Sequence, residues 1–311
     1  MTAQFLEGKP VAEAVLQDVS LRVEALKSRG ITPGLGTILV GDDSASAGYV
    51  RKKHETCEQA GIRSFDKRIP ANASQEDLLA EFGPALQRLA ARGGVAVVPV
   101  FAVGRAQAVL HAIAQLKAKG AIPRGLPVFL DSPMAVHTTN LFNQHPDDHR
   151  LSARAAQAMA HAATMIETPE QSKALANRHG PMVILAASGM ATGGRVLHHL
   201  ALYAGNRRNM VILTGYQSPG TRGARLAAGE SPVRIHGKEV EVAAEVVQLQ
   251  SASAHADANQ LLDWLRKMRG APDQVYVVHG DMAASDALRQ RIEHELKWRA
   301  IVPEHGATWP V

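Results

Sequence analysis

Short apolar runs of β type alternate with longer segments of helical periodicity along most of the chain. The segment from about Val11 to Ser28 places its apolar residues with helical spacing, and Leu35 to Val40 follows as an apolar run that ends at Gly41-Asp42-Asp43. Further strand-like runs are Ile62 to Ile69, Val95 to Phe101, Val128 to Leu130, Met182 to Ala186, Met210 to Thr214 and Tyr276 to Val278. This alternation is typical of parallel sheets covered by helices. We therefore predict an α/β fold with mostly parallel sheets flanked by helices.

One segment departs from this order. Residues from Ser231 to Gln250 alternate every second position around His236-Gly237-Lys238. A period of two around a glycine turn predicts an antiparallel β-hairpin.

Composition excludes several classes of protein. With 311 residues, 46% hydrophobic and 20% charged, the chain has the size and balance of about two globular domains. No apolar stretch approaches the roughly 18 residues of a membrane span, and Glu7 and Lys9 interrupt the place of a signal sequence, so we expect a cytoplasmic protein with no membrane partner.

The single cysteine, Cys57, leaves histidines and carboxylates as the possible metal ligands. A net charge of +5 is compatible with a phosphate-bearing partner without selecting one.

Glycine-rich turns carrying an arginine follow three of the predicted strands. They are Pro99 to Gln107 with Arg105, Ser188 to Arg195, and Gly215 to Gly223 with Arg222. One such turn is more often a tight turn with a capping arginine. Three on strand ends of one sheet predict a groove that follows a phosphate backbone.

Two histidines and one tyrosine–lysine pair are further candidates. His255 lies in Ser253-Ala254-His255-Ala256-Asp257, and His279 ends the last predicted strand beside Asp281. A histidine at such a place can bind a metal or transfer a proton, although a single one is more often structural. Tyr49 and Lys53 are four residues apart, which places them on one helix face, either directed into a pocket or on a solvated basic surface.

Residues from about 5 to 78, with PGLGTILVGDDSASAGYVRKKHETCEQAGI, resemble the start of the bifunctional methylenetetrahydrofolate dehydrogenase/cyclohydrolase family. The resemblance implies that Tyr49 and Lys53 bind folate and that Lys53 is the catalytic group of the cyclohydrolase step. That family continues with a Gln-Leu-Pro-Leu-Pro segment and a Gly-Arg-Ser-x-x-Val-Gly-x-Pro dinucleotide turn, and neither occurs here. We therefore do not expect NADP binding.

From about Ala80 the chain resembles the β-CASP members of the metallo-β-lactamase superfamily, which are RNA-processing nucleases. GGVAVVPVFAVGRAQ, PVFLDSPMAV, ILAASGMATGGRVLHHL, VILTGYQSPGTRG, SASAHAD and VYVVHGD occur in the family's order. The resemblance implies that His255 is the general acid at the scissile phosphate and that His279 is a zinc ligand. The residues expected along the RNA groove are Arg105, Ser188, Arg195, Tyr216, Gln217 and, from its glycine turn, Arg222.

The two resemblances together predict a fusion. We expect residues 1–79 to be a folate dehydrogenase/cyclohydrolase-like fragment, 80–230 a β-CASP domain, and 231–311 a partial metallo-β-lactamase-like segment with the hairpin. The join falls inside a helix predicted from Ser74, its N-cap, to Arg92, and the apolar spacing continues through it.

The zinc-binding half of the superfamily is missing from the sequence. That half carries His-x-His-x-Asp-His, and no His-x-His occurs in this chain. Because a catalytic zinc normally needs three protein ligands, we expect zinc not to be retained and the chain by itself to be inactive. We expect single-stranded RNA as a partner, with a metallo-β-lactamase half supplied in trans. Two alternatives remain: a folate-binding protein related to the dehydrogenase/cyclohydrolase, and a non-enzymatic nucleic-acid-binding fusion remnant.

Overall fold

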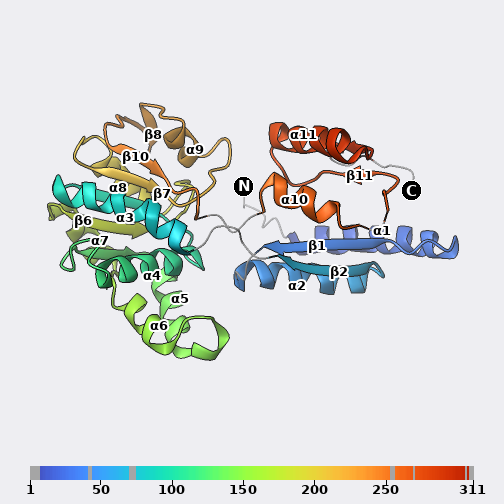
Figure 1. Ribbon diagram of the computed structural model, residues 1–311, viewed down its shortest axis with the longest axis horizontal. Helices are drawn as coiled ribbons and strands as arrows, with labels where there is room; N and C mark the ends of the chain where they lie inside the picture. The colour runs from blue at the N-terminus through green and yellow to red at the C-terminus, as the bar shows by residue number, and fades with distance from the viewer. Residues whose placement is uncertain are drawn as a thin grey trace, which may run out of the picture. The chain divides into compact units, whose positions relative to one another are not determined.

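The chain forms two compact units, Met1–Asn72 and Ala73–Val311. The structure, a computed structural model, describes residues 8–40, 44–69, 75–252, 256–268, 270–304 and 307 (Figure 1). Three features singled out in the sequence therefore lie outside the described residues: Gly41-Asp42-Asp43, the N-cap Ser74, and Ser253-Ala254-His255.

The first unit is a helix followed by one β-α-β crossover. Its elements are α1 (Gly8–Ser28), β1 (Gly34–Val40), α2 (Ser44–Gln59) and β2 (Arg63–Ile69). The two strands pair in parallel, with Gly34 opposite Arg63 at one end of the ladder and Val40 opposite Ile69 at the other. A parallel pair requires a crossover, which α2 supplies.

The second unit is built on a six-stranded sheet in the order β10-β7-β3-β6-β4-β5, in which every pair is parallel. The strands are β3 (Val95–Pro99), β4 (Val128–Asp131), β5 (Thr164–Met165), β6 (Met182–Ala186), β7 (Met210–Leu213) and β10 (Glu245–Gln248). The helices are α3 (Gln75–Ala91), α4 (Arg105–Ala118), α5 (Pro133–Gln144), α6 (Ala153–Ala160), α7 (Pro169–Ala174), α8 (Val196–Tyr203) and α9 (Arg222–Ala227), with short 3₁₀ turns at Pro146–Asp148 and Leu175–Asn177.

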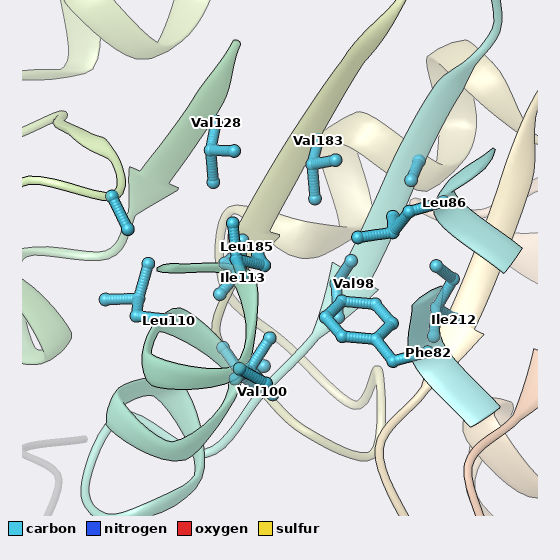
Figure 2. Packing of buried hydrophobic residues seen from close by; sticks show 14 of the residues in the cluster. Phe82, Leu86, Val98, Val100, Leu110, Ile113, Val128, Val183, Leu185 and Ile212 are labelled. Atoms are coloured by element: carbon cyan, nitrogen blue, oxygen red, sulfur yellow. The ribbon is translucent and has the colours of Figure 1, made fainter. Parts of the chain in front are cut away.

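Alternate residues of the central strands face two separate hydrophobic cores. Val98 packs with Phe82 and Leu86 of α3 and with Ile113 of α4, as Figure 2 shows. The neighbouring residue Val97 packs in the other core, which α8 and α9 help to form. A strand buried on both faces reads as a continuous apolar run, which is why VAVVP and MVILA are apolar throughout.

Helix α3 spans the junction between the two sequence resemblances and packs in the second unit. Its Phe82, Leu86 and Leu89 are fully buried. Arg88 and Arg92 form ion pairs with Glu245 of the edge strand β10, at 2.7 and 2.6 Å. The helix is therefore fixed to the sheet by both apolar burial and charge.

The remaining elements are a hairpin and a small C-terminal cluster. Strands β8 (Val233–Ile235) and β9 (Lys238–Val240) pair antiparallel around His236-Gly237, as the sequence predicts. Beyond them lie α10 (Ala258–Leu265), β11 (Val275–Tyr276), α11 (Met282–Arg291), a π-helical turn (Ile292–Leu296) and β12 (Ala300–Ile301), which pairs in parallel with β11. Leu262, Val277, Ile292 and Ala300 form the centre of this cluster.

The predicted α/β class with mostly parallel sheets flanked by helices is confirmed. The three domain limits drawn from the sequence stay a prediction. Within the described residues, no helix combines the length and apolar character needed to cross a membrane.

Candidate nucleic-acid interface

The carboxyl ends of four adjacent parallel strands lie at one edge of the large sheet. Because β7, β3, β6 and β4 are neighbours running in the same direction, the loops that follow them emerge together. In open α/β sheets this edge is where ligands bind. We call the loops after β3, β6 and β7, together with the helix starts that follow two of them, the strand-end surface: residues 100–105, 187–195 and 214–223.

Direct contacts join the three loops of this surface. The backbone N–H of Gly223 donates to the carbonyl of Met190 at 3.0 Å. The ring of Phe101 lies against Gly189, where an added Cβ would come within 2.8 Å of the ring. The structure thus brings together the three glycine turns singled out in the sequence.

Glycine is required at two of the turns for different reasons. Gly104 has a φ of 77° immediately before α4, a left-handed conformation that side chains other than glycine rarely adopt. Gly194 combines a φ of 76° with a close approach, because a Cβ there would lie 2.5 Å from the carbonyl oxygen of Ala187. Both glycines shape the loops that carry Arg105 and Arg195.

The Arg195 side chain forms hydrogen bonds within the protein. Its guanidinium donates to Oδ1 of Asp131 at 2.7 Å and to the carbonyls of Ile166 and Glu167 at 3.3 and 3.0 Å. Asp131 ends β4 and is fully buried. The Arg195 side chain therefore closes an internal ion pair at the base of the strand-end surface.

Asp131 is the acceptor at the centre of this network. Its Oδ2 accepts from the Ser172 hydroxyl at 2.5 Å and from Nε2 of the buried His199 at 2.6 Å. Burial by itself raises the pKa of the Asp131 carboxyl, but the hydrogen bonds from His199, Ser172 and Arg195 outweigh burial and hold this pKa below its ordinary value. Asp131 is ionised at neutral pH and anchors three separate segments.

Arg222 and Arg105 occupy equivalent places after their strands. The Arg222 guanidinium donates to the backbone carbonyls of Arg234 and Ala191, and so ties the β8 strand to the loop after β6. Arg105 is the first residue of α4 and is half-buried. Its position at the start of a helix behind Gly104 is suited to an anion, because the backbone N–H groups of the first turn point the same way.

The remaining predicted groove residues line the same loops. Ser188 accepts a hydrogen bond from the Thr192 N–H at 3.1 Å. Gln217 is buried, and among the residues that the structure describes its Oε1 has no hydrogen-bond partner. Tyr216 is exposed, and its hydroxyl donates to Asp281, two residues after His279. This bond links the strand-end surface to the C-terminal cluster.

The described residues do not fit a zinc centre. His279 is exposed in the loop after β11, with a φ of 67°. Over the described ranges, no three His, Cys, Asp or Glu side chains come close enough to hold a metal ion. His255 lies outside those ranges. The roles assigned to His255 and His279 stay predictions.

The pair Tyr49 and Lys53 shares one face of α2, as the spacing requires. Nζ of Lys53 lies 4.7 Å from the centre of the Tyr49 ring, a cation–π contact. The next residue, His54, is 2.6 Å from the Thr37 hydroxyl of β1 through its Nε2. Their role in folate binding stays a prediction.

Sequence reasoning missed Asp131 and Phe101. A carboxylate at the end of an otherwise apolar strand is the signal that could have identified Asp131, since buried acids need partners. Phe101 had no such signal, because an aromatic residue after an apolar strand is equally compatible with a core position.

Three protein-family models match the chain. Residues 6–118 match "Tetrahydrofolate dehydrogenase/cyclohydrolase, catalytic domain", residues 106–226 match "Beta-Casp domain", and residues 239–303 match "Zn-dependent metallo-hydrolase RNA specificity domain". The first two overlap over residues 106–118, which is nearly all of α4.

Curated relatives of this chain fall into two groups. Ribonuclease TTHA0252 of Thermus thermophilus is 39% identical over 208 residues, which cover 65% of this chain and 46% of the relative. Transcription termination factor FttA of Methanosarcina mazei is 32% identical over 217 residues, 66% of this chain and 34% of the relative. Bifunctional protein FolD of Syntrophotalea carbinolica is 66% identical over 80 residues, 26% of this chain and 28% of the relative. The chain spans less than half the length of each of these relatives.

Proposed function

We propose that this chain binds single-stranded RNA at the strand-end surface. Its residues 106–226 match the Beta-Casp domain, and residues 239–303 match the RNA specificity domain of zinc-dependent metallo-hydrolases. The observation that carries this proposal is the convergence of the three glycine turns at one edge of the sheet. Loops with backbone N–H groups and a helix start at their centre are suited to phosphates.

Arg195 and Arg222 donate to protein acceptors and so support the shape of the loops. We assign Arg105 to the RNA phosphate on its position, because it begins α4, where the backbone N–H groups of the first helical turn are suited to an anion. Replacing Arg195 would disturb the Asp131 network and confuse loss of folding with loss of binding, so it is a poor test of phosphate contact.

Salt dependence tests the proposal directly. Fluorescence anisotropy with a labelled single-stranded RNA should give saturable binding at low salt, with an affinity that falls steeply as salt rises. Arg105→Ala should weaken binding and reduce the salt slope by ~0.7, the value for one phosphate contact on a single strand.

The matched control is Arg124→Ala, which removes the same charge from an exposed arginine just before β4, at the opposite edge of the sheet. This variant should keep the salt slope of the unmodified chain. Absence of saturable binding at low salt, or equal effects of the two substitutions, would overturn the proposal.

We also propose that phosphodiester hydrolysis needs ligands beyond those in this chain. The RNA specificity domain belongs to zinc-dependent hydrolases, whereas this sequence has no His-x-His. A partner carrying the metallo-β-lactamase metal half would supply the missing ligands in trans. The chain's own part in that assembly is to bind and orient RNA.

A second function, folate binding by the first unit, is favoured by one observation. The tetrahydrofolate dehydrogenase/cyclohydrolase model matches residues 6–118, which include Tyr49 and Lys53, and these two side chains are in contact. Calorimetric titration with tetrahydrofolate tests it: binding that is lost in Lys53→Ala supports the function, and absence of heat at millimolar ligand excludes it.

A further inference from the structure

Phe101 is an exposed aromatic residue on a rigid part of the strand-end surface. It lies two residues after the end of β3, and 45% of its surface is accessible. Its carbonyl accepts the backbone N–H of Ala106 at 3.1 Å, which ties Phe101 to the first turn of α4. The accessible part of the ring adds nothing to the apolar burial that stabilises the fold and is open to a ligand.

Gly189 supports the ring from one side. Gly189, itself buried, lies beneath it, and a Cβ added there would meet the ring carbons Cδ2, Cε2 and Cγ at 2.8 to 3.0 Å. The ring therefore rests on a backbone that only glycine allows at this distance. The accessible part of the ring is available to a flat apolar partner.

The arginine close to Phe101 in sequence indicates the chemistry of the partner. Arg105 lies four residues further along the same turn, at the start of α4. One turn thus presents an aromatic face beside a cationic helix start. A nucleotide has the complementary pair, a flat base and a phosphate, and base–aromatic stacking is the usual way in which proteins hold single strands without regard to sequence.

We infer that Phe101, supported by Gly189, is a stacking platform for one base of the single-stranded RNA. The inference rests on the proposed function and adds a contact to the base, whereas Arg105 contacts the phosphate. It also predicts weak discrimination among bases, because every base has a π face.

Two substitutions of Phe101 separate stacking from apolar bulk. Phe101→Leu keeps an apolar side chain without a π face and should weaken binding to a single-stranded oligoadenylate at least about fivefold, the lower end of what one stacking aromatic contributes. Phe101→Tyr should bind as the unmodified chain does. Gly189→Ala should weaken binding as well, since the new Cβ displaces the ring while the backbone at that position stays in an ordinary conformation.

Leu202→Ala is the matched control. Leu202 is an exposed apolar residue of similar accessibility, 50%. It lies near the end of α8, the helix that leads away from the strand-end surface. It should leave the affinity unchanged. A melting curve for each variant verifies that the fold is intact.

A comparison of two RNA probes distinguishes base stacking by Phe101 from a purely structural role. One is the oligoadenylate with a central 2-aminopurine, and the other is an abasic strand of equal length and charge. Phe101→Leu should weaken the first and leave the second unchanged, and the 2-aminopurine fluorescence quenched by the unmodified chain should recover. Equal loss on both probes, or no loss on either, overturns the platform while the proposed RNA binding stands. Failure of the unmodified chain to bind either probe overturns the proposed function, and the platform with it.

Discussion

The Asp131 network offers a sharp test of how the strand-end surface is held together. Asp131→Asn keeps the shape of the side chain and removes its charge. The carboxylate accepts from Arg195 on Oδ1 and from Ser172 and His199 on Oδ2. An amide has one oxygen and one NH₂ group, so one side of the network must face a donor with a donor.

The magnitude follows from the burial of this group. Asp131 is fully buried and Arg195 is mostly so, with 21% of its side chain accessible. Removing one partner of a buried ion pair costs about 3 to 5 kcal/mol because the other charge is left without compensation. At ~3 °C per kcal/mol for a unit of this size, we expect the melting temperature to fall by roughly 10 °C.

The pH dependence of the melting temperature provides an independent check that the Asp131 charge stabilises the fold. Because the pKa of Asp131 is lowered in the folded chain, its stabilisation is complete above the unfolded pKa of about 4 and is lost as the pH falls through the folded pKa. The gap in melting temperature between Asp131→Asn and the unmodified chain should therefore narrow below pH ~4.

The assay is thermal unfolding by circular dichroism, with Asp263→Asn as control. Asp263 of α10 pairs with Arg266, the residue after the helix, and both side chains are largely exposed, so loss of this pair should cost less than ~1 kcal/mol. Equal shifts for the two variants, or a shift below ~2 °C for Asp131→Asn, would refute the reasoning.

Three further predictions concern the junction and the upstream segment. Phe82→Ala in α3 should destabilise the second unit by about 3 to 5 kcal/mol in urea unfolding, since the ring is fully buried, and a loss below ~1 kcal/mol would mean that α3 does not pack in the core. Hydrogen bonds from Arg88 and Arg92 outweigh burial and lower the pKa of Glu245, so Glu245→Gln should cost ~1 kcal/mol at neutral pH and little below pH ~4; a pH-independent loss would contradict the ion-pair account. Methylenetetrahydrofolate should give no rise in reduced-cofactor absorbance with NAD or NADP, because the dinucleotide turn is missing from the sequence; a rise that Lys53→Ala abolishes would reverse this.

Much of the fold could be predicted from the sequence because buried parallel strands are short and apolar throughout. The runs at Val95, Met182 and Met210 identify β3, β6 and β7, and the period of two around His236 identifies the hairpin. Strand order could not be predicted, because the edge strand β10 pairs with β7 although the β8–β9 hairpin separates them in sequence. Pairing of distant strands depends on packing that local patterns do not encode.

The meeting of the three glycine turns could be predicted from the sequence, whereas the contacts of their side chains could not. Glycine and arginine after apolar strands identified the three loops that meet at the sheet edge. The sequence does not reveal that the Arg195 guanidinium is bound to a buried carboxylate. That contact depends on Asp131, which is 64 residues away along the chain.

Reconstitution of RNA cleavage tests the central claim most directly. The claim is that this chain supplies RNA-binding parts of a β-CASP nuclease while most of the metal ligands lie elsewhere. A fluorescent single-stranded RNA is incubated with the purified chain, with a separately expressed metallo-β-lactamase half, and with both, and zinc is measured by elemental analysis in each sample. The account predicts well under one zinc and no cleavage for the chain by itself, and cleavage only when both are present. Two zinc ions and cleavage by the chain alone, with activity lost in His279→Ala, would contradict it.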